Sequence, residues 1–273
     1  MSAGPADGVE FESINWRGKQ VEIEHQWIKR DQTGLPLLVF LHEGLGSVAM
    51  WKDFPQQLCN ALPARGLVYS RPGYGHSTPR AAGEHWQPDF MHRQAHEVLP
   101  ALLAALHVTG KPWLFGHSDG GSIALLAASR RLDSFAGLIA LAPHWMVEET
   151  GLASIRKARA AYAEGGLSER LARYHDDVDS AFKGWNDIWL DPAFVAWNIE
   201  AELRAIACPV LAVQGLNDEY GTLAQIHGIA ARLPQTQVLE LPACGHSPHR
   251  DQPAALIAAV KEFMALHLQA RPD

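Results

Sequence analysis

The segment 114–121 constrains the fold of this chain more than any other stretch, because an apolar strand pattern runs directly into a turn of small residues. Gly116, Ser118 and Gly120 form the pattern Gly-x-Ser-x-Gly, with the serine at its apex. A nucleophile on a tight strand-to-helix turn has a strained backbone, so the residues two positions away must be nearly free of side chain. The turn directs the next backbone N–H, that of Asp119, toward the place where an oxyanion would form. A five-residue match is short, so the rest of the chain must support it.

Strand patterns alternate with helix patterns along most of the chain, which predicts a mostly parallel sheet covered by helices. The apolar run 37–41 is typical of a strand buried on both faces, and the alternating run 21–28 of an exposed antiparallel strand. The expected strands are 21–28, 37–41, 66–70, 113–115, 137–141, 210–214 and 238–241, and the expected helices are 90–106, 118–131, 223–233 and 253–268.

One segment breaks this alternation. Residues 144–205 have a polar, helical pattern without an apolar strand run, and four tryptophans are spread through them: Trp145, Trp185, Trp189 and Trp197. We therefore expect a core made of 1–143 and 206–273, with 144–205 inserted as a helical cap. Trp145 directly follows an expected strand, which makes it the candidate for an acyl or aromatic subsite.

A nucleophilic serine needs a base, and the base needs an acid that orients it. Asp218 follows the expected strand 210–214, and His246 follows the strand 238–241. The carboxyl ends of parallel strands meet at one edge of a sheet, so both residues are expected near Ser118. Glu219 and His249 are the neighbouring rivals for the two roles. The chain order Ser, Asp, His favours Ser118, Asp218 and His246 as a catalytic triad.

An oxyanion formed at Ser118 needs two donors, which we expect to be backbone amides. Asp119 supplies one from the turn itself. The loop 42–47 after the strand 37–41 supplies the other, with Gly44 as first choice and Leu45 as the alternative.

Five short segments carry a resemblance to a known family. They are His42-Glu43-Gly44-Leu45-Gly46-Ser47, Arg71-Pro72-Gly73-Tyr74-Gly75-His76-Ser77, Gly116-His117-Ser118-Asp119-Gly120-Gly121, Asp218 and Gly245-His246. The chain resembles the α/β-hydrolase-fold serine hydrolases and is most similar to the valacyclovirase (biphenyl-hydrolase-like) branch. The resemblance implies an α/β-hydrolase fold with a helical lid and a reaction that needs no cofactor.

The resemblance implies hydrolysis of a small carboxylic ester, such as an aromatic or amino-acid ester, through an acyl-enzyme on Ser118. A thioesterase, a C–C bond hydrolase and a non-catalytic ligand-binding protein of the same fold stay open as alternatives. Glu43 stands where the family usually has glycine. Its carboxylate could bind a cationic substrate group, orient a water or pair with Arg71. Together with His117 and Trp145, it is expected to contact substrate.

Composition excludes several other functions. The 273 residues carry a formal net charge of -7, which disfavours nucleic acid and anionic membranes as partners. Residues 1–18 lack a basic region followed by an apolar run, so we expect no secretory signal and a cytoplasmic protein.

The three scattered cysteines indicate neither disulfides nor a zinc cluster. His92 and His96 lack a third ligand, so an exposed helix face without metal is expected. The oligomeric state stays open, with a homodimer as one option.

Overall fold

The computed structural model describes residues 8–130 and 133–269 of the chain. Its centre is an eight-stranded sheet with the order β1-β2-β4-β3-β5-β6-β7-β8. β1 pairs with β2 and β2 with β4 in antiparallel register, and the pairs from β4 to β8 are parallel. The predicted mostly parallel sheet is confirmed. The strands are β1 (Val9–Trp16), β2 (Lys19–Ile28), β3 (Leu37–Leu41), β4 (Arg65–Tyr69), β5 (Trp113–His117), β6 (Gly137–Leu141), β7 (Val210–Gly215) and β8 (Thr236–Leu241).

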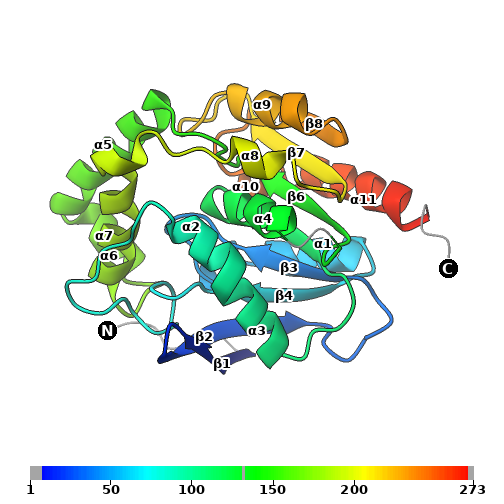
Figure 1. The fold of residues 1–273 in the computed structure, drawn as a ribbon, viewed down its shortest axis with the longest axis horizontal. Coiled ribbons are helices and arrows are strands. Elements are labelled where there is room, and N and C mark those ends of the chain that lie inside the picture. The colour runs from blue at the N-terminus through cyan, green and yellow to red at the C-terminus, as the bar shows by residue number, and fades with distance from the viewer. Residues whose placement is uncertain (1–7, 131–132, 270–273) are drawn as a thin grey trace.

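Helices cover both faces of this sheet (Figure 1). In chain order they are α1 (Phe54–Ala61), α2 (Phe90–Arg93), α3 (Leu99–Ala105), α4 (Asp119–Arg130), α5 (Glu149–Ala163), α6 (Gly166–Leu171), α7 (Val178–Trp189), α8 (Glu200–Leu203), α9 (Ala224–Arg232), α10 (Pro248–Asp251) and α11 (Pro253–Gln269). None of the helices in the described ranges combines the length and hydropathy needed to cross a bilayer.

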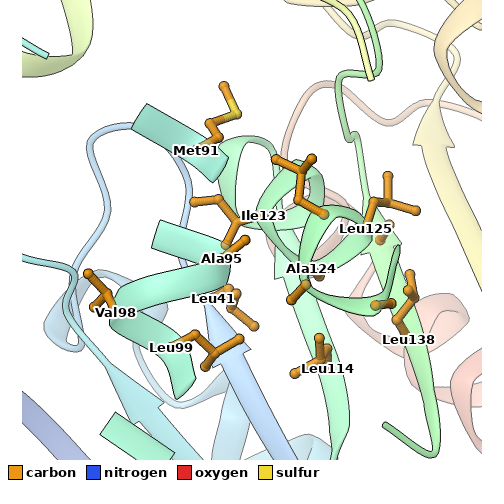
Figure 2. Close-up of a cluster of buried hydrophobic side chains, with 14 of the residues drawn as sticks. Leu41, Met91, Ala95, Val98, Leu99, Leu114, Ile123, Ala124, Leu125 and Leu138 are labelled. Atoms are coloured by element: carbon orange, nitrogen blue, oxygen red, sulfur yellow. The ribbon is translucent and has the colours of Figure 1, made fainter. Parts of the chain in front are cut away.

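Two apolar cores lie on opposite faces of the sheet. On one face, side chains of α2, of the π-helical turn Gln94–Val98, of α3 and of α4 pack on alternate residues of the strands, as Figure 2 shows for Met91, Val98, Leu99, Ile123 and Leu114. On the other face, α1 and α11 contribute a second cluster that includes Phe54, Leu58, Leu256, Val260 and Phe263. β3, β5 and β6 are buried along their whole length, because both of their faces are covered. Burial of both faces holds the central strands, and therefore their ends, in fixed positions.

The short helices α1 and α10 are absent from the sequence expectation, and two further elements differ from it. The helix expected over 90–106 contains a π-helical turn, Gln94–Val98, between α2 and α3. The strand β1 is absent from the sequence expectation, because it is an edge strand whose residues are mostly exposed or half-buried, with Ile14 as its buried residue. The end of the helix expected at Arg131 lies outside the described residues, as do residues 1–7 and 270–273 of the predicted core.

The chain between β6 and β7 forms α5, α6, α7 and α8, and an isolated bridge pairs Met146, before α5, with Asn198, between α7 and α8. In Figure 1, α5, α6 and α7 lie together at the left, beside the sheet. α7 buries Phe182, Trp185 and Trp189, which recur at the three- and four-residue spacing of one helix face. The segment is helical as expected, and its exact limits, 144 and 205, stay a prediction.

Candidate active site

The carboxyl ends of five parallel strands bring the candidate residues to one edge of the sheet. Ser118 follows β5 in the middle, and the loop beginning at His42 follows β3 on one side of it. His144 follows β6 on the other side, and the segments with Asp218 and His246 follow β7 and β8. Residues 100 or more positions apart in the sequence therefore meet because of the strand order.

The turn at Ser118 has the strained geometry that the sequence motif predicts. Ser118 has a φ of 52°, in the left-handed region that non-glycine residues rarely adopt. A Cβ on Gly116 would collide with the backbone of Gly120, and a Cβ on Gly120 would collide with the backbone of Leu41. Both flanking positions therefore require glycine, which allows the serine to stand at the apex between β5 and α4.

Ser118, His246 and Asp218 form one hydrogen-bonded chain. The Ser118 Oγ lies 2.9 Å from His246 Nε2, and His246 Nδ1 lies 2.8 Å from Asp218 Oδ1. These separations allow the serine hydroxyl to donate to the imidazole and the imidazole to donate to the carboxylate. The rival His249 is buried against Trp51 and makes no contact with the serine hydroxyl in the described part of the chain.

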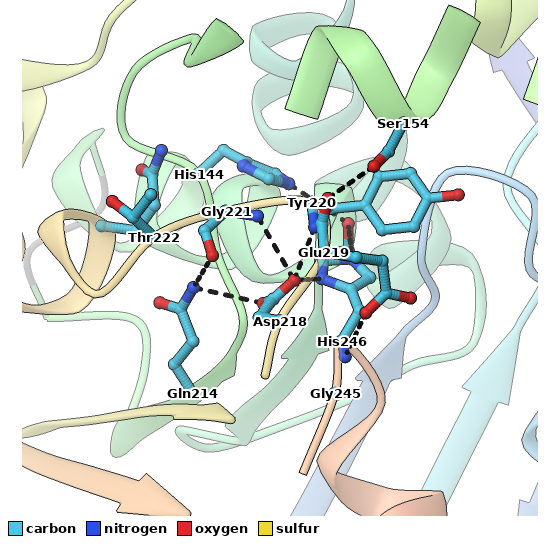
Figure 3. A network of polar contacts seen from close by, with 12 residues as sticks. His144, Ser154, Gln214, Asp218, Glu219, Tyr220, Gly221, Thr222, Gly245 and His246 are labelled. Carbon is cyan, nitrogen blue, oxygen red and sulfur yellow. Dashed lines mark hydrogen bonds and ion pairs between the residues drawn. The ribbon is translucent and has the colours of Figure 1, made fainter. Parts of the chain in front are cut away.

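Asp218 is held by several donors besides the histidine (Figure 3). Its Oδ1 accepts from the backbone N–H of Tyr220 at 2.8 Å and of Gly221 at 3.3 Å, and its Oδ2 accepts from Gln214 Nε2 at 3.2 Å. Burial raises the pKa of the Asp218 carboxyl, but His246 and the Tyr220 amide outweigh burial and hold the pKa below its usual value. The rival Glu219 is exposed and accepts from the backbone N–H of His246 at 3.2 Å.

The loop after β3 has one strongly fixed peptide. The carbonyl of Glu43 accepts from His42 Nδ1 at 2.7 Å, Arg71 Nη2 at 2.8 Å and Gly46 N at 3.1 Å. His42 Nε2 accepts from the Arg71 backbone N–H at 3.0 Å, so the neutral His42 ring carries its proton on Nδ1. Burial and Arg71 hold the pKa of His42 well below its usual value. C=O and N–H point in opposite directions across a trans peptide, so the Gly44 N–H points away from Arg71.

Glu43 does not use its carboxylate for Arg71. Its Oε2 lies 3.5 Å from His117 Nδ1, and its Oε1 lies 3.7 Å from Arg250 Nη2. Burial raises the pKa of the Glu43 carboxyl, but His117, His249 and Arg250 together hold the pKa well below its usual range. The pairing with Arg71 expected as one alternative is therefore replaced by contacts to two residues that sequence analysis did not connect with Glu43.

A cavity of about 140 Å³ opens beside Ser118. Its polar wall contains Ser118 and His246, and its apolar wall comes from α5, α7 and the loop after β3. Both Gly44 and Leu45 line it, and the indole of Trp185 fills the space where a Cβ on Gly44 would lie. The lining residues are Glu43, Gly44, Leu45, His117, Ser118, Asp119, His144, Gly151, Ile155, Trp185, Trp189, Tyr220, His246 and Ser247.

The structure corrects the sequence expectation for Trp145. Its indole packs against α9, donates to the Ala224 carbonyl at 3.1 Å and lies under the Arg232 guanidinium at 3.9 Å from the ring centroid. Its backbone N–H donates to Gln225 at 2.8 Å, which turns the residue away from Ser118. Trp145 therefore does not line the cavity, and Trp185 and Trp189 take the place that the sequence suggested for it.

Among the cavity residues that sequence reasoning missed, two have polar side chains beside the nucleophile. His144 Nε2 lies 3.5 Å from Ser118 Oγ, and burial lowers the pKa of this histidine to about 3. The Asp119 carboxylate accepts from Trp189 Nε1 at 3.2 Å through Oδ1, and its buried Oδ2 has no partner among the described residues. The position of His144 just after a central strand was the available signal for it. The sequence motif points to Asp119 for its backbone N–H alone.

Two further expectations concern metals and cysteines. His92 and His96 are half-buried, not exposed as expected, because His92 contacts Glu202 at 3.2 Å and His96 contacts the Leu126 carbonyl at 3.0 Å. The three cysteines are buried free thiols. No group of three or more metal-binding side chains gathers anywhere in residues 8–130 and 133–269.

Comparisons with known proteins agree with this fold. The synthase of 2-succinyl-6-hydroxy-2,4-cyclohexadiene-1-carboxylate from Enterobacter sp. (strain 638) is 26% identical over 272 residues, covering 88% of this chain and 95% of its own. A carboxylesterase from Nitrososphaera gargenis superposes with a TM-score of 0.76 at 18% identity, covering 95% of this chain and 100% of its own. The enol-lactonase from Burkholderia xenovorans LB400 gives 0.73 at 21% identity, covering 94% and 100%. The model of the alpha/beta hydrolase family matches residues 38–260, and the chain belongs to that family.

Proposed function

We propose that the protein is a serine hydrolase that cleaves small carboxylic esters through an acyl-enzyme on Ser118. The observation that carries this proposal is the hydrogen-bonded chain from Ser118 Oγ through the His246 ring to Asp218, with separations of 2.9 and 2.8 Å. A nucleophile, a base within reach of its proton and an acid that fixes the base's tautomer are the three parts that acyl transfer requires.

In the first half-reaction, Ser118 Oγ forms a bond to the substrate carbonyl carbon while its proton passes to His246 Nε2. The carbonyl oxygen becomes an oxyanion that accepts from the backbone N–H groups of Gly44 and Asp119, each contributing on the order of 3 kcal/mol. The bond to the leaving oxygen then breaks, and His246 gives the proton to the departing alcohol. Water repeats the sequence on the acyl-enzyme, which releases the acid and restores the serine hydroxyl.

Gly44 is the better of the two candidates for the second oxyanion donor. The three donors on the Glu43 carbonyl fix the peptide, and the Gly44 N–H of that peptide points away from them. Neither this N–H nor that of Asp119 makes a backbone hydrogen bond within the described residues. Both amides are thus available to a substrate oxygen.

The acyl group is proposed to carry a positive charge, as in an amino-acid ester. Asp119 lies next to the nucleophile, is buried, and keeps one carboxylate oxygen without a partner. Among the described residues, this carboxylate forms no ion pair with a lysine or arginine, and Arg71 acts on it only from beyond 4.0 Å. Burial raises the pKa of Asp119 to about 6, against the opposing effects of Arg71 and Trp189, so the group is mostly ionised at neutral pH. A buried carboxylate with one oxygen free and no ion pair is suited to an ammonium group of the substrate.

The negative charge of the cavity argues against the proposal that this chain catalyses the reaction named for the Enterobacter relative. The product in that enzyme's name carries carboxylate groups. The residues that line the cavity here include Glu43 and Asp119 but no lysine or arginine. An anionic product would therefore meet like charge. An ester whose acyl part is small and cationic, in keeping with the valacyclovirase-like resemblance, fits the cavity better.

The test is labelling with a fluorophosphonate probe, which reacts with an activated serine whatever the natural substrate. We expect one labelled peptide, containing Ser118, and no labelling of the Ser118→Ala variant. Turnover of a panel of p-nitrophenyl esters, acyl-CoA thioesters and amino-acid esters then ranks the leaving groups. Labelling of another residue, or undiminished labelling of Ser118→Ala, would contradict the proposal.

A further inference from the structure

Glu43 and His117 face each other beneath the catalytic histidine. The His117 side chain is 1% exposed, and its Nε2 lies 2.7 Å from the carbonyl oxygen of His246. Its Nδ1 faces Glu43 Oε2 at 3.5 Å, a distance for an ion pair. A carbonyl can only accept, so the ring must present an N–H at Nε2. A neutral ring with its N–H at Nε2 would present a lone pair at Nδ1 to the carboxylate, so the carboxylate favours a ring that carries a proton on both nitrogens, and that ring donates from Nε2.

We propose that Glu43 and His117 are a positioning pair for His246, in which the Glu43 carboxylate orients the His117 ring so that it donates to the His246 carbonyl. The proposal rests on the serine hydrolase function proposed above. It assigns a role to the carboxylate that stands where the family usually has glycine. Neither residue needs to touch substrate for this role.

The His246 backbone is held from two directions that differ in burial. On the outside, the exposed carboxylates of Glu219 and Asp251 accept from the N–H groups of His246 and Gly245 at 3.2 and 2.8 Å. On the inside, His117 is the donor to the His246 carbonyl. A buried hydrogen bond has no water to replace it, so its loss costs more than the loss of an exposed one. The inner contact should therefore dominate the placement of the imidazole.

Glu43 also connects this inner contact with the oxyanion loop. Its backbone carbonyl belongs to the peptide that orients the Gly44 N–H, while its side chain reaches His117 and Arg250. A Cβ on Gly46 would lie 2.5 Å from Glu43 Oε2, so the loop leaves room for this carboxylate by having glycine there. Through Glu43, the loop after β3 and the loop after β8 are held in one arrangement.

The surroundings of the pair contain few other charges. The rings of His246, His249 and Trp51 lie around His117, at centroid distances of 5.1, 4.9 and 6.4 Å. Burial lowers the pKa of His249 to about 2, with His117 adding to the effect, so His249 is neutral at working pH. The described charged groups that act on Glu43 are therefore Arg250, at 3.7 Å, and the Asp119 carboxylate, which carries the same sign of charge.

The experiment measures the second-order rate constant of fluorophosphonate labelling, with the melting temperature as a check on folding. We expect a 10- to 100-fold slower rate for His117→Phe, since a misplacement of about 1 Å at a reacting group has an effect of this size. His117→Gln, which can still donate, should recover part of the rate. Glu43→Gln keeps the shape but loses the charge, so a smaller loss is expected.

Two comparisons make the test specific. In the double variant Glu43→Gln/His117→Phe, labelling should be no slower than in His117→Phe, because the glutamate acts through the histidine. The matched comparison is Glu219→Gln, the same chemical change at an exposed carboxylate bonded to the N–H of His246, with a rate within about twofold of the wild type.

The outcomes separate this inference from the proposed function. If the wild type is not labelled at Ser118, the proposed function fails. If the wild type is labelled and His117→Phe and His117→Gln both react at the wild-type rate, the positioning pair is overturned. Independent, multiplicative losses in the double variant would also overturn it, because they would mean that Glu43 acts on the site by a different route.

Discussion

The cavity has two walls that differ in chemistry and in origin. The wall at the edge of the sheet contains Ser118 and His246, and Asp218 lies behind them, joined to His246 in the same hydrogen-bonded network. The facing wall comes from α5 and α7 and presents Ile155, Trp185 and Trp189. A single described hydrogen bond, from Trp189 to Asp119, joins the α7 wall to the residues at the elbow.

This difference indicates how the work of the site is divided. The polar wall depends on directional contacts, so small changes in geometry there should alter the rate of bond making and breaking. The aromatic wall offers area and shape, so changes there should alter which acyl group is accepted. Asp119 belongs to both walls, because it begins α4 at the nucleophile and accepts from a tryptophan of α7.

The largest effect that would test this division is expected for Asp218→Asn. The amide cannot hold the His246 ring in the tautomer that accepts from Ser118, and the same change in the triad of a serine protease costs about 10⁴-fold in kcat. We expect a loss of roughly 10³- to 10⁴-fold in kcat/KM for an activated ester and a similarly slower labelling rate.

Asp251→Asn is the matched control for that variant. It makes the same substitution at an exposed carboxylate that accepts from Gly245 N at 2.8 Å, one residue before His246. Exposed contacts of this type contribute about 0–1 kcal/mol, so a loss of less than about fivefold is expected. Equal losses in the two variants would mean that the carboxylate of Asp218 supports the loop and not the imidazole.

An intermediate effect is expected for Asp119→Asn, and it should depend on substrate charge. We expect kcat/KM for an amino-acid ester to fall by about 10- to 100-fold, with a change of only a few-fold for an uncharged ester of similar size and the same alcohol. The ratio of the two kcat/KM values removes the contribution of His246, which acts equally on both. A parallel loss on both esters would contradict a role for Asp119 in binding a cation.

The protonation of Asp119 also predicts how the ratio of the two kcat/KM values changes with pH. Because burial raises the pKa of this group to about 6, the preference for the cationic ester should weaken as the pH falls through about 6. The free energy of unfolding has the opposite pH dependence: it falls as the pH rises, since the native state binds this proton more tightly than the unfolded state does. The stability from the protonated group is lost as the pH rises toward 6, so Asp119→Asn should raise the melting temperature more at pH 8 than at pH 5.

The sequence predicted the polar wall because its parts are local or depend on strand order. Gly116, Ser118 and Gly120 are close in the chain, and the steric need for glycine follows from the turn itself. Asp218 and His246 each follow a strand that pattern analysis could find, and parallel strands bring their ends to one edge. The edge strand β1 escaped prediction because a mostly exposed strand has a weak apolar pattern.

The aromatic wall could not be predicted in the same way. The sequence shows tryptophans at 145, 185, 189 and 197 but not the direction of each ring. Trp145 lies next to a strand end, yet Gln225 and Ala224 bind its backbone and indole N–H groups and hold it against α9. The contact between Glu43 and His117 could not be predicted either, because the two residues are 74 positions apart and the contact depends on the direction of both side chains.

The smallest and most selective effect is expected from a matched pair of tryptophans, Trp145→Phe and Trp185→Phe. Their exposures are similar, 8% and 6%, so both variants should lose stability, on the order of 1–3 kcal/mol. Trp185 lines the cavity and fills the space beside Gly44, so its replacement should shift acyl-chain preference a few-fold toward longer chains. Trp145 contacts Arg232 and α9, so its replacement should leave the preference unchanged. The check is kcat/KM over p-nitrophenyl esters of increasing length, and an altered preference in Trp145→Phe alone would reverse the assignment of the two rings.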